Sequence, residues 1–174
     1  MALSRLSPRW RLQQLDLALS TFCLCHRFNH QVARVCRLIS RTGDGPWYLL
    51  LALVLLRWEP VHGPAFFTAL LLAFAIELPL YWLLKNAIRR HRPLDLPCFI
   101  VPSDKYSLPS GHTAAAFLVC GLIAAYYPLW LLPALCWAVL IGLSRVLLGV
   151  HYLTDIVAGA LLGLSCAKLA LEWL

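Results

Sequence analysis

After residue 45 the chain consists mostly of long apolar runs joined by short polar stretches. A membrane-spanning helix needs roughly 20 consecutive, mostly apolar residues. Five runs approach or reach this length, and they cover residues 46–58, 64–88, 109–127, 128–148 and 154–173. The pattern predicts an all-α fold, a polytopic membrane bundle of about five transmembrane helices. We expect residues 1–174 to form a single domain, with residues 46–174 as its transmembrane core.

The first run is short for a membrane span. Extended to Val61, residues 46–58 would reach only about 24 Å at the rise of an α-helix, less than the ~30 Å hydrocarbon core. Trp47, Tyr48 and Trp58 flank the run, as aromatic anchors at the membrane interface do. We therefore expect the bilayer to thin around this helix or flanking residues to complete the crossing.

Residues 1–45 differ from the rest of the chain because polar residues are scattered through them. No window within residues 12–41 is apolar enough to cross a bilayer, so we predict amphipathic helices at the membrane interface. His26 and His30 stand four residues apart. We interpret them as interfacial side chains, with a metal site as the alternative.

Two acidic residues stand out because each lies beside or within an apolar run. Asp44 precedes Pro46 at a helix start, which predicts a helix N-cap, with contact to a neighbouring cation as the alternative. Glu77 lies near the middle of the second run, where an ionisable group should face other helices or a wet cavity. We interpret Glu77 as a packing residue, with a catalytic role as the alternative.

Composition supports a membrane protein. The chain is 61% hydrophobic and 13% charged, whereas soluble domains are nearer half apolar and a quarter charged. The net charge of +7 would indicate nucleic-acid binding in a soluble protein. In a membrane chain these cations favour contacts with the interface or an anionic headgroup, and we expect no nucleic-acid partner.

The first of three polar clusters follows the second apolar run. It carries four cations within eight residues, namely Lys85, Arg89, Arg90 and Arg92. Lys85 and Arg92 are seven residues apart, two helical turns, so on a continuous helix both would point at one place.

The second cluster, Pro109-Ser110-Gly111-His112, opens the third run. A helix start of this kind leaves backbone N–H groups facing outward, where the helix dipole favours an anion. His112 would stand one turn into the helix beside that anion. By itself, Ser110 would be read as an ordinary N-cap.

The third cluster lies at residues 144–155 and holds Arg145, His151 and Asp155. His151 and Asp155 are four residues apart, so on a helical turn they would share one face and their side chains could meet. A carboxylate on one imidazole nitrogen fixes the tautomer and leaves the other free to attack or to accept a proton. Arg145 adds a planar cation suited to phosphate oxygens. Taken alone, the pair would be read as an ion pair at a helix end.

With five spans, all three clusters fall on one side of the membrane, which predicts a single site. Gly159 and Gly163 in the fifth run form a GxxxG pattern, which predicts a close helix-packing face.

The three clusters together resemble the signature of the type 2 phosphatidate phosphatase (PAP2) superfamily, which also contains acid phosphatases and vanadium haloperoxidases. The signature reads Lys, six residues, Arg-Pro; then Pro-Ser-Gly-His; then Ser-Arg, five residues, His, three residues, Asp. All parts are present in order between Lys85 and Asp155 without a departure. The soluble haloperoxidases are disfavoured by the apolar spans, so the resemblance implies a small bacterial membrane lipid phosphatase. Many bacterial members have six spans, whereas we expect five here.

The resemblance implies roles for these residues. His151 would attack phosphorus and form a phosphohistidine, Asp155 would orient it, and His112 would protonate the leaving oxygen and then activate water. The phosphoryl oxygens would be bound by Lys85, Arg92, Ser110, Gly111 and Arg145. Arg89, Arg90 and Lys105 are candidate contacts for a second phosphate of the headgroup. We expect no cofactor and no metal, because cations and a helix N-terminus can supply the charge stabilisation.

The implied substrate is a phospholipid or isoprenyl phosphate or diphosphate, for which undecaprenyl diphosphate, phosphatidylglycerophosphate and phosphatidate are the candidates. A lipid phosphotransferase using the same intermediate is one alternative, and a lipid transporter or scramblase is another. We expect a multi-pass protein of the bacterial cytoplasmic membrane. The excess of Lys and Arg on the site side predicts a cytoplasmic site, whereas the family resemblance favours the outer, periplasmic face, which we adopt.

Overall fold

The computed structural model describes residues 8–25, 29–93, 96–102 and 104–174, with only the backbone described for residues 8–13. All regular elements among these residues are helices, which confirms the predicted all-α class. They follow in the order α1 (Pro8–Leu24), α2 (Asn29–Arg41), α3 (Gly45–Trp58), α4 (Gly63–Ile88), α5 (Gly111–Tyr126), the 3₁₀ turn η2 (Pro128–Trp130), α6 (Leu131–Leu147) and α7 (Leu153–Glu172).

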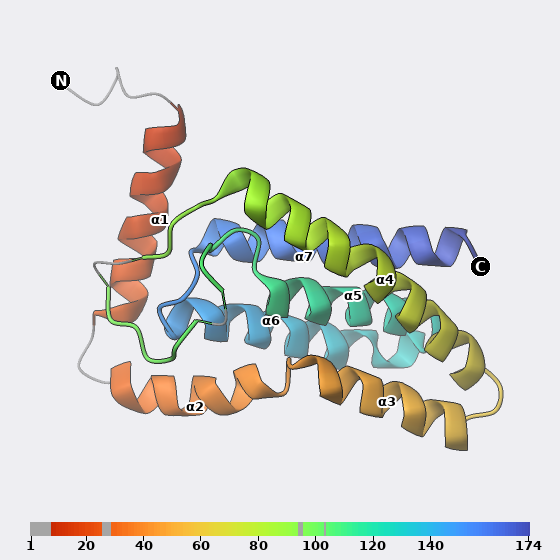
Figure 1. The fold of residues 1–174 in the computed structure, drawn as a ribbon. Helices are drawn as coiled ribbons and strands as arrows, with labels where there is room; N and C mark the ends of the chain where they lie inside the picture. Colours follow the sequence, from red (N-terminus) through yellow and green to blue (C-terminus); the bar gives the residue numbers. More distant parts are fainter. Residues whose placement is uncertain (1–7, 26–28, 94–95, 103) are drawn as a thin grey trace.

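Helices α3 to α7 run alongside one another and form the bundle (Figure 1). Helix α5 lies at its centre and contacts α4, α6 and α7. Its buried positions, which include Ala114, Ala116 and Val119, lie on several faces of the helix because neighbours surround it. The outer surface is also apolar, with exposed leucines on α3, α4, α6 and α7. An apolar core inside an apolar surface is the arrangement expected for a bundle in lipid.

Three helical segments are long and apolar enough to cross a membrane by length and composition: Gly63–Ile88, Pro128–Leu147 and Leu153–Glu172. Their bounds lie within a residue or so of the predicted runs because the apolar pattern sets both. Helices α3 and α5 are also apolar but have only 14 and 16 residues. At about 1.5 Å per residue, α3 is roughly 21 Å long, which agrees with the predicted short span.

The GxxxG pattern packs α7 against α5, as predicted. A Cβ atom on Gly159 would approach the Ser110 carbonyl oxygen to 2.5 Å, and one on Gly163 would overlap the Ala114 carbonyl. The two backbones therefore meet directly, and the Ser110 amide donates to the Asp155 carbonyl at 3.1 Å. This contact fixes the start of α5 against the start of α7.

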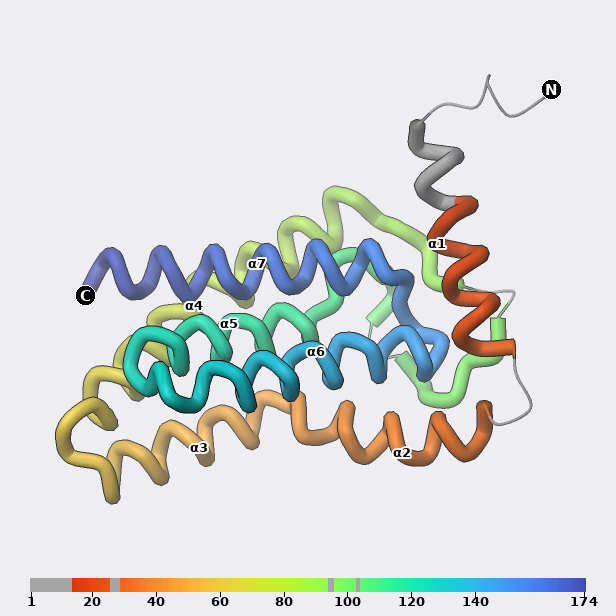
Figure 2. Tube along the Cα trace, turned by 180° about the vertical axis from the view of Figure 1, so that it is seen from behind, coloured from red at the N-terminus to blue at the C-terminus, as the bar shows by residue number. Residues whose placement is uncertain are grey.

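The N-terminal segment contains two helices, one across the end of the bundle and one along its side. Figures 1 and 2 show α1 crossing the end of the bundle, while α2 lies in line with α3. Helix α1 buries Asp16, Ser20 and Leu24 at intervals of four residues and exposes Leu15 and Phe22. Its polar face thus packs inward and its apolar face outward. Helix α2 buries Ala33, Cys36 and Ser40, and it packs against α6.

Candidate active site

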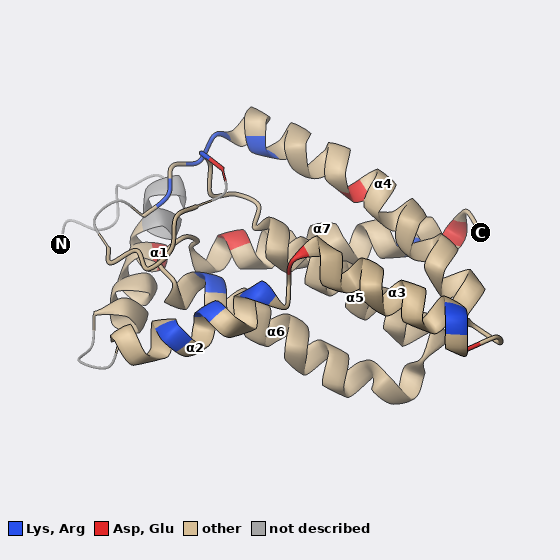
Figure 3. Cartoon of the chain, turned by 60° about the horizontal axis from the view of Figure 1, so that its bottom comes forward, with Lys and Arg blue, Asp and Glu red and all other residues tan. Residues whose placement is uncertain are grey.

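Charged side chains gather toward the end of the bundle that α1 and α2 cover. Figure 3 shows most of the described Lys and Arg there, with few cations toward the other end. All three sequence clusters lie in this region. Arg92 of the first cluster is 3.4 Å from His151 of the third, and Ser110 of the second bonds to the backbone of Asp155. The structure thus brings the three clusters together, as the topology predicted.

His151 lies in the short connection between α6 and α7. Gly149 turns the chain there with a φ of +76°, and a Cβ atom on it would overlap the Pro97 carbonyl, so this close approach needs glycine. The turn buries His151, whose Nε2 is 3.4 Å from the Nη1 atom of Arg92. Its Nδ1 is 3.6 Å from the Oδ2 atom of Asp155, which is beyond hydrogen-bond length but within ion-pair range.

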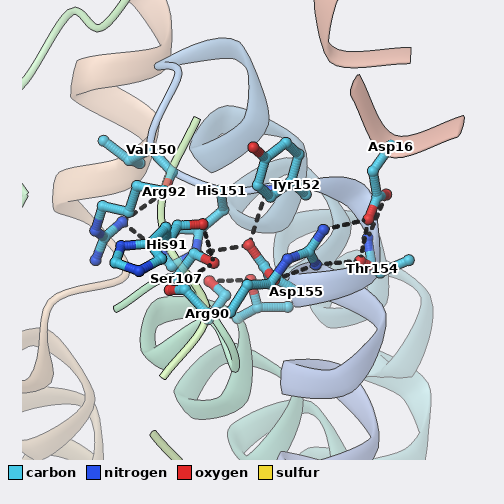
Figure 4. A network of polar contacts seen from close by, with 12 residues as sticks. Asp16, Arg90, His91, Arg92, Ser107, Val150, His151, Tyr152, Thr154 and Asp155 are labelled. Atoms are coloured by element: carbon cyan, nitrogen blue, oxygen red, sulfur yellow. Dashed lines mark hydrogen bonds and ion pairs between the residues drawn. The ribbon is translucent and has the colours of Figure 1, made fainter. Parts of the chain in front are cut away.

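Asp155 is fixed by neighbours other than His151 (Figure 4). Its Oδ2 atom accepts from the Tyr152 amide at 2.8 Å, in a capping arrangement at the start of α7. Its Oδ1 atom accepts from Arg90 at 2.8 Å. The carboxylate is fully buried and held in one orientation beside the imidazole.

The surroundings of His151 keep its imidazole neutral. Burial lowers the pKa of His151 to about 4, Arg92 and Arg145 act in the same direction, and Asp155 opposes them. A neutral imidazole keeps an unprotonated nitrogen, which is the form that can attack phosphorus.

Arg90 is an internal residue rather than the headgroup contact that the sequence suggested. Its guanidinium donates to Asp155, to Thr154 at 2.6 Å and to Asp16 at 2.7 Å. It also lies 4.2 Å above the centre of the Tyr152 ring. With these partners it links α1 to the start of α7 and is unavailable for a second phosphate. Arg89 and Lys105, the other two candidates, are exposed.

Lys85 and Arg92 converge, but not for the predicted reason. Helix α4 ends at Ile88, so Arg92 lies in the following loop and the two residues share no helix face. Their convergence is on Asp104, which contacts the Lys85 Nζ atom at 2.7 Å and the Arg92 Nη2 atom at 2.5 Å. Tyr81 donates a third hydrogen bond to Asp104, at 2.7 Å. Burial alone would raise the pKa of Asp104, but the hydrogen bonds from Lys85, Tyr81 and Arg92 outweigh it and lower this pKa to about 2.

His112 lies in the first turn of α5 and contacts Asp44. Its Nε2 atom is 2.9 Å from the Asp44 Oδ1 atom. Asp44 occupies the N-cap position of α3, but its side chain makes no capping hydrogen bond there. This contact replaces the predicted cap, and it matches the alternative, contact with a neighbouring cation, only when the His112 imidazole is protonated. Ser110, the N-cap of α5, is buried and accepts from Thr113 at 2.9 Å.

A cavity of about 170 Å³ opens beside His112 and Arg145. It is lined by Arg37, Ser40, Arg41, Asp44, Ile100, His112, Arg145 and Leu148. Arg145 donates to Ser40 at 2.7 Å, while its Nε–H has no partner among the described residues. Three arginines line this one small cavity, and a guanidinium is suited to binding anionic oxygens.

Three carboxylates hold basic side chains of the site, and the sequence interpretation missed two of them, Asp16 and Asp104. Asp16 contacts Arg90, Asp44 contacts His112, and Asp104 joins Lys85 to Arg92. Only Asp44 carried a signal, its place at a helix start. Glu77 is buried in α4, two turns before Lys85, as a packing residue would be.

The proposed alternative of a metal site at His26 and His30 falls partly outside the described residues, since His26 is not among them. His30 packs edge-on against the Phe99 ring at 5.3 Å. No group of three or more His, Cys, Asp or Glu side chains suited to a metal occurs in the described part of the chain.

The family model described as "PAP2 superfamily" matches residues 65–174, which include all three clusters. Phosphatidylglycerophosphatase B of Bacillus subtilis (strain 168) is 39% identical over 107 residues, 55% of this chain and 51% of that protein. The decaprenylphosphoryl-5-phosphoribose phosphatase of Mycobacterium tuberculosis (strain ATCC 25618 / H37Rv) is 40% identical over 88 residues, 47% of this chain and 46% of that protein. The chain thus spans about half the length of these curated relatives.

Two crystal structures share the fold along most of the chain. The transmembrane PAP2 type phosphatidylglycerolphosphate phosphatase of Bacillus subtilis superposes with a TM-score of 0.77 at 28% identity, covering 94% of this chain and 86% of that one. Aquifex aeolicus LpxE superposes with a TM-score of 0.79 at 24% identity, covering 99% of each chain. The second similarity establishes the fold alone.

Proposed function

This chain belongs to the PAP2 superfamily, and on that premise we propose that it is a membrane lipid phosphatase. It hydrolyses a phosphomonoester or diphosphate headgroup through a phosphohistidine intermediate. The observation that carries the proposal is the position of His151, which lies between a fixed carboxylate, Asp155, and the cation Arg92. A phosphate held by Arg92 would meet the imidazole nitrogen that faces away from Asp155.

The reaction takes two steps. In the first, the Nε2 atom of His151 bonds to phosphorus while the bond from phosphorus to the lipid oxygen breaks, and His112 donates a proton to that oxygen. In the second, His112 takes a proton from water, the water oxygen bonds to phosphorus, and the bond to His151 breaks. Asp155 stabilises the positive charge that His151 carries in the intermediate, and Asp44 orients His112.

Charge stabilisation comes from this chain's own groups. Lys85, Arg92 and Arg145 bind the phosphoryl oxygens, and the start of α5 adds the Ser110 hydroxyl and the Gly111 backbone N–H. Phosphoryl transfer depends mainly on positioning and on stabilising the charge of the transferred group. The proposed reaction therefore needs no metal ion or cofactor.

A headgroup with a second negative charge fits the cavity best. Arg37 and Arg41 of α2 line the same cavity as Arg145, and both are exposed to solvent at its edge. They take the place of Arg90 as contacts for a second anionic group. Phosphatidylglycerophosphate and undecaprenyl diphosphate carry such a group and phosphatidate does not, so we rank the first two higher. The name of the Bacillus subtilis relative supports phosphatidylglycerophosphate.

We place the protein in the bacterial cytoplasmic membrane with the site on the outer face. The cations at the site end would by themselves favour the cytoplasm. However, Lys85, Arg90 and Arg92 are each paired with carboxylates inside the site, which accounts for their presence without a topogenic role. Right-side-out vesicles should hydrolyse added substrate, and inverted vesicles should do so only after permeabilisation. The opposite pattern would place the site in the cytoplasm.

The deciding experiment is phosphate release by the purified full chain in detergent with EDTA. The panel contains undecaprenyl diphosphate, phosphatidylglycerophosphate and phosphatidate. Wild type and the distant surface variant Glu172→Gln should release phosphate equally, and His151→Ala should release none. Release that survives His151→Ala would refute the proposal. If the lipid loses its phosphate only when an acceptor lipid is added, the protein is a phosphotransferase. If lipid movement across the bilayer survives the loss of His112 and His151, the protein is a transporter.

A further inference from the structure

Asp104 binds Lys85 and Arg92, the two cations that the proposed function assigns to the phosphate. One oxygen of its carboxylate lies 2.7 Å from the Lys85 Nζ atom, and the other lies 2.5 Å from the Arg92 Nη2 atom. Tyr81 donates to the first of these oxygens at 2.7 Å. Two anionic oxygens bound across an ammonium and a guanidinium reproduce the way a phosphoryl group would be held.

The carboxylate also lies on the side from which a ligand must arrive. The Lys85 and Arg92 side chains are only 6% and 9% exposed, whereas the Asp104 side chain is 31% exposed. The same guanidinium that binds Asp104 through Nη2 reaches His151 through Nη1. Asp104 therefore covers the two cations proposed to bind phosphate, and one of them, Arg92, is in contact with His151.

We propose that Asp104 is a specificity-determining residue, an internal anion that a phosphomonoester displaces and a phosphodiester does not. The inference rests on the proposed function, because it takes Lys85 and Arg92 as the phosphate-binding cations. It concerns a problem that any lipid phosphatase meets: the surrounding bilayer is rich in phosphodiester headgroups that resemble the substrate.

Charge decides the competition. A phosphodiester carries one negative charge, the same as the Asp104 carboxylate, so it gains nothing by taking the place of an anion that is already tethered. A phosphomonoester carries about 1.5 to 2 negative charges near neutral pH and offers three terminal oxygens. It forms stronger charge-assisted hydrogen bonds with Lys85 and Arg92 and moves Asp104 aside. The tethered carboxylate lowers the apparent affinity for every anion, and only the dianion still binds.

The test measures binding rather than turnover. Titration calorimetry on the detergent-purified full chain would compare inorganic phosphate with dimethyl phosphate, a water-soluble phosphodiester. Wild type should bind inorganic phosphate and show no heat with dimethyl phosphate. Asp104→Asn, which keeps the shape and removes the charge, should bind inorganic phosphate about tenfold more tightly and should also bind dimethyl phosphate. Asp104→Glu, which retains the charge, should still exclude dimethyl phosphate, and Glu172→Gln should behave as wild type.

Weaker phosphate binding by Asp104→Asn, or continued exclusion of dimethyl phosphate by it, would overturn the proposal and make Asp104 a support for Lys85 and Arg92. If Asp104→Asn does not fold, Asp104→Glu supplies the test, because it retains the charge. Binding of dimethyl phosphate by Asp104→Glu would then overturn the proposal. These results do not depend on hydrolysis. Phosphate release that survives His151→Ala would refute the proposed function while leaving the binding result intact.

Discussion

The Nδ1 atom of His151 lies 3.6 Å from the Oδ2 atom of Asp155, and that same oxygen accepts a 2.8 Å hydrogen bond from the Tyr152 amide. The carboxylate is thus held by the backbone at the start of its own helix, close to the imidazole but not hydrogen-bonded to it. In the proposed mechanism His151 becomes positively charged when it attacks phosphorus, so we expect the ion pair with Asp155 to strengthen at that step. On this proposal Asp155 stabilises the phosphohistidine more than it stabilises the resting site.

Replacing Asp155 with Asn tests this relationship. The variant keeps the shape of the side chain but loses the charge that stabilises a positively charged His151. We expect kcat to fall roughly 100-fold or more, with little change in KM, because the interaction matters in the transition state. Steady-state kinetics on one lipid would measure it, and equal losses in kcat and in substrate affinity would contradict the assigned role.

The Asp16 carboxylate should matter for stability as well as activity. Asp16→Asn removes an ion pair to Arg90 that is mostly buried, with side-chain exposures of 3% and 19%. We expect a loss of about 1–3 kcal/mol and a lower apparent Tm in detergent, because charged hydrogen bonds of this kind contribute that much. Replacing Glu172 in the exposed Lys168–Glu172 pair is the matched control and should leave the Tm unchanged. Equal effects of the two changes would show that α1 is not anchored through Asp16.

His151 should make the protein less stable in acid. Its pKa is lowered to about 4 in the folded chain, against an ordinary value of 6.5, so the unfolded chain binds the proton first. Stability is therefore complete above about pH 6.5 and declines as the pH falls toward 4, by up to about 3 kcal/mol. Melting curves across this range should show the decline in wild type and a shallower one in His151→Gln. Parallel curves for the two proteins would contradict the assignment.

The α5–α7 contact should tolerate no added methyl group. In Gly163→Ala the new Cβ would overlap the Ala114 carbonyl, so α7 must move away from α5. We expect a loss of about 1–3 kcal/mol, the usual effect of overpacking, together with reduced activity because Ser110 shifts relative to Asp155. Gly45→Ala is the matched control, since nothing lies within 4 Å of its added Cβ. Thermal melting of the two variants decides the matter, and an unchanged Tm for Gly163→Ala would show that the helices can separate freely.

The arginines of α2 should set headgroup preference. Arg37→Gln together with Arg41→Gln removes two charges from the cavity but leaves Arg145 in place. We expect KM to rise about tenfold for undecaprenyl diphosphate and phosphatidylglycerophosphate, which corresponds to about 1.4 kcal/mol of binding free energy. For phosphatidate, which has no second anionic group for these arginines, KM should change little. Loss that is equal across all three lipids would mean that α2 contacts no second charge.

The sequence was a good guide to the helices and to the polar clusters. The hydrophobic runs set the bounds of α4 and α7 nearly to the residue, because a bilayer imposes length and apolarity on each span. Gly159 and Gly163 were informative for a similar reason, since two small residues one turn apart leave a backbone open to close packing. Local spacing also predicted that His151 and Asp155 would meet, as they do, but His151 precedes the start of α7 at Leu153, so the two residues share no helix face.

The partners of the cations were beyond sequence reasoning. Asp104 lies 19 residues from Lys85 in the chain, and Asp16 lies 74 residues from Arg90. Neither spacing belongs to a helix or a turn, so each contact depends on how whole helices are placed. Arg90 looked like a free cation in a basic run, and only the position of α1 shows that it is an internal link. Because α4 ends at Ile88, Lys85 and Arg92 are not on one continuous helix, and they meet through Asp104 instead.

The family match begins at residue 65, yet two of the carboxylates that hold the site precede it. Asp16 reaches Arg90 from α1, and Asp44 reaches His112 from the start of α3. A chain trimmed to the matched region would keep every signature residue but lose Asp44, which contacts His112, and Asp16, which holds Arg90 beside Asp155. We therefore expect the smallest active unit to extend beyond the motif that identifies the family, into α1 and the start of α3.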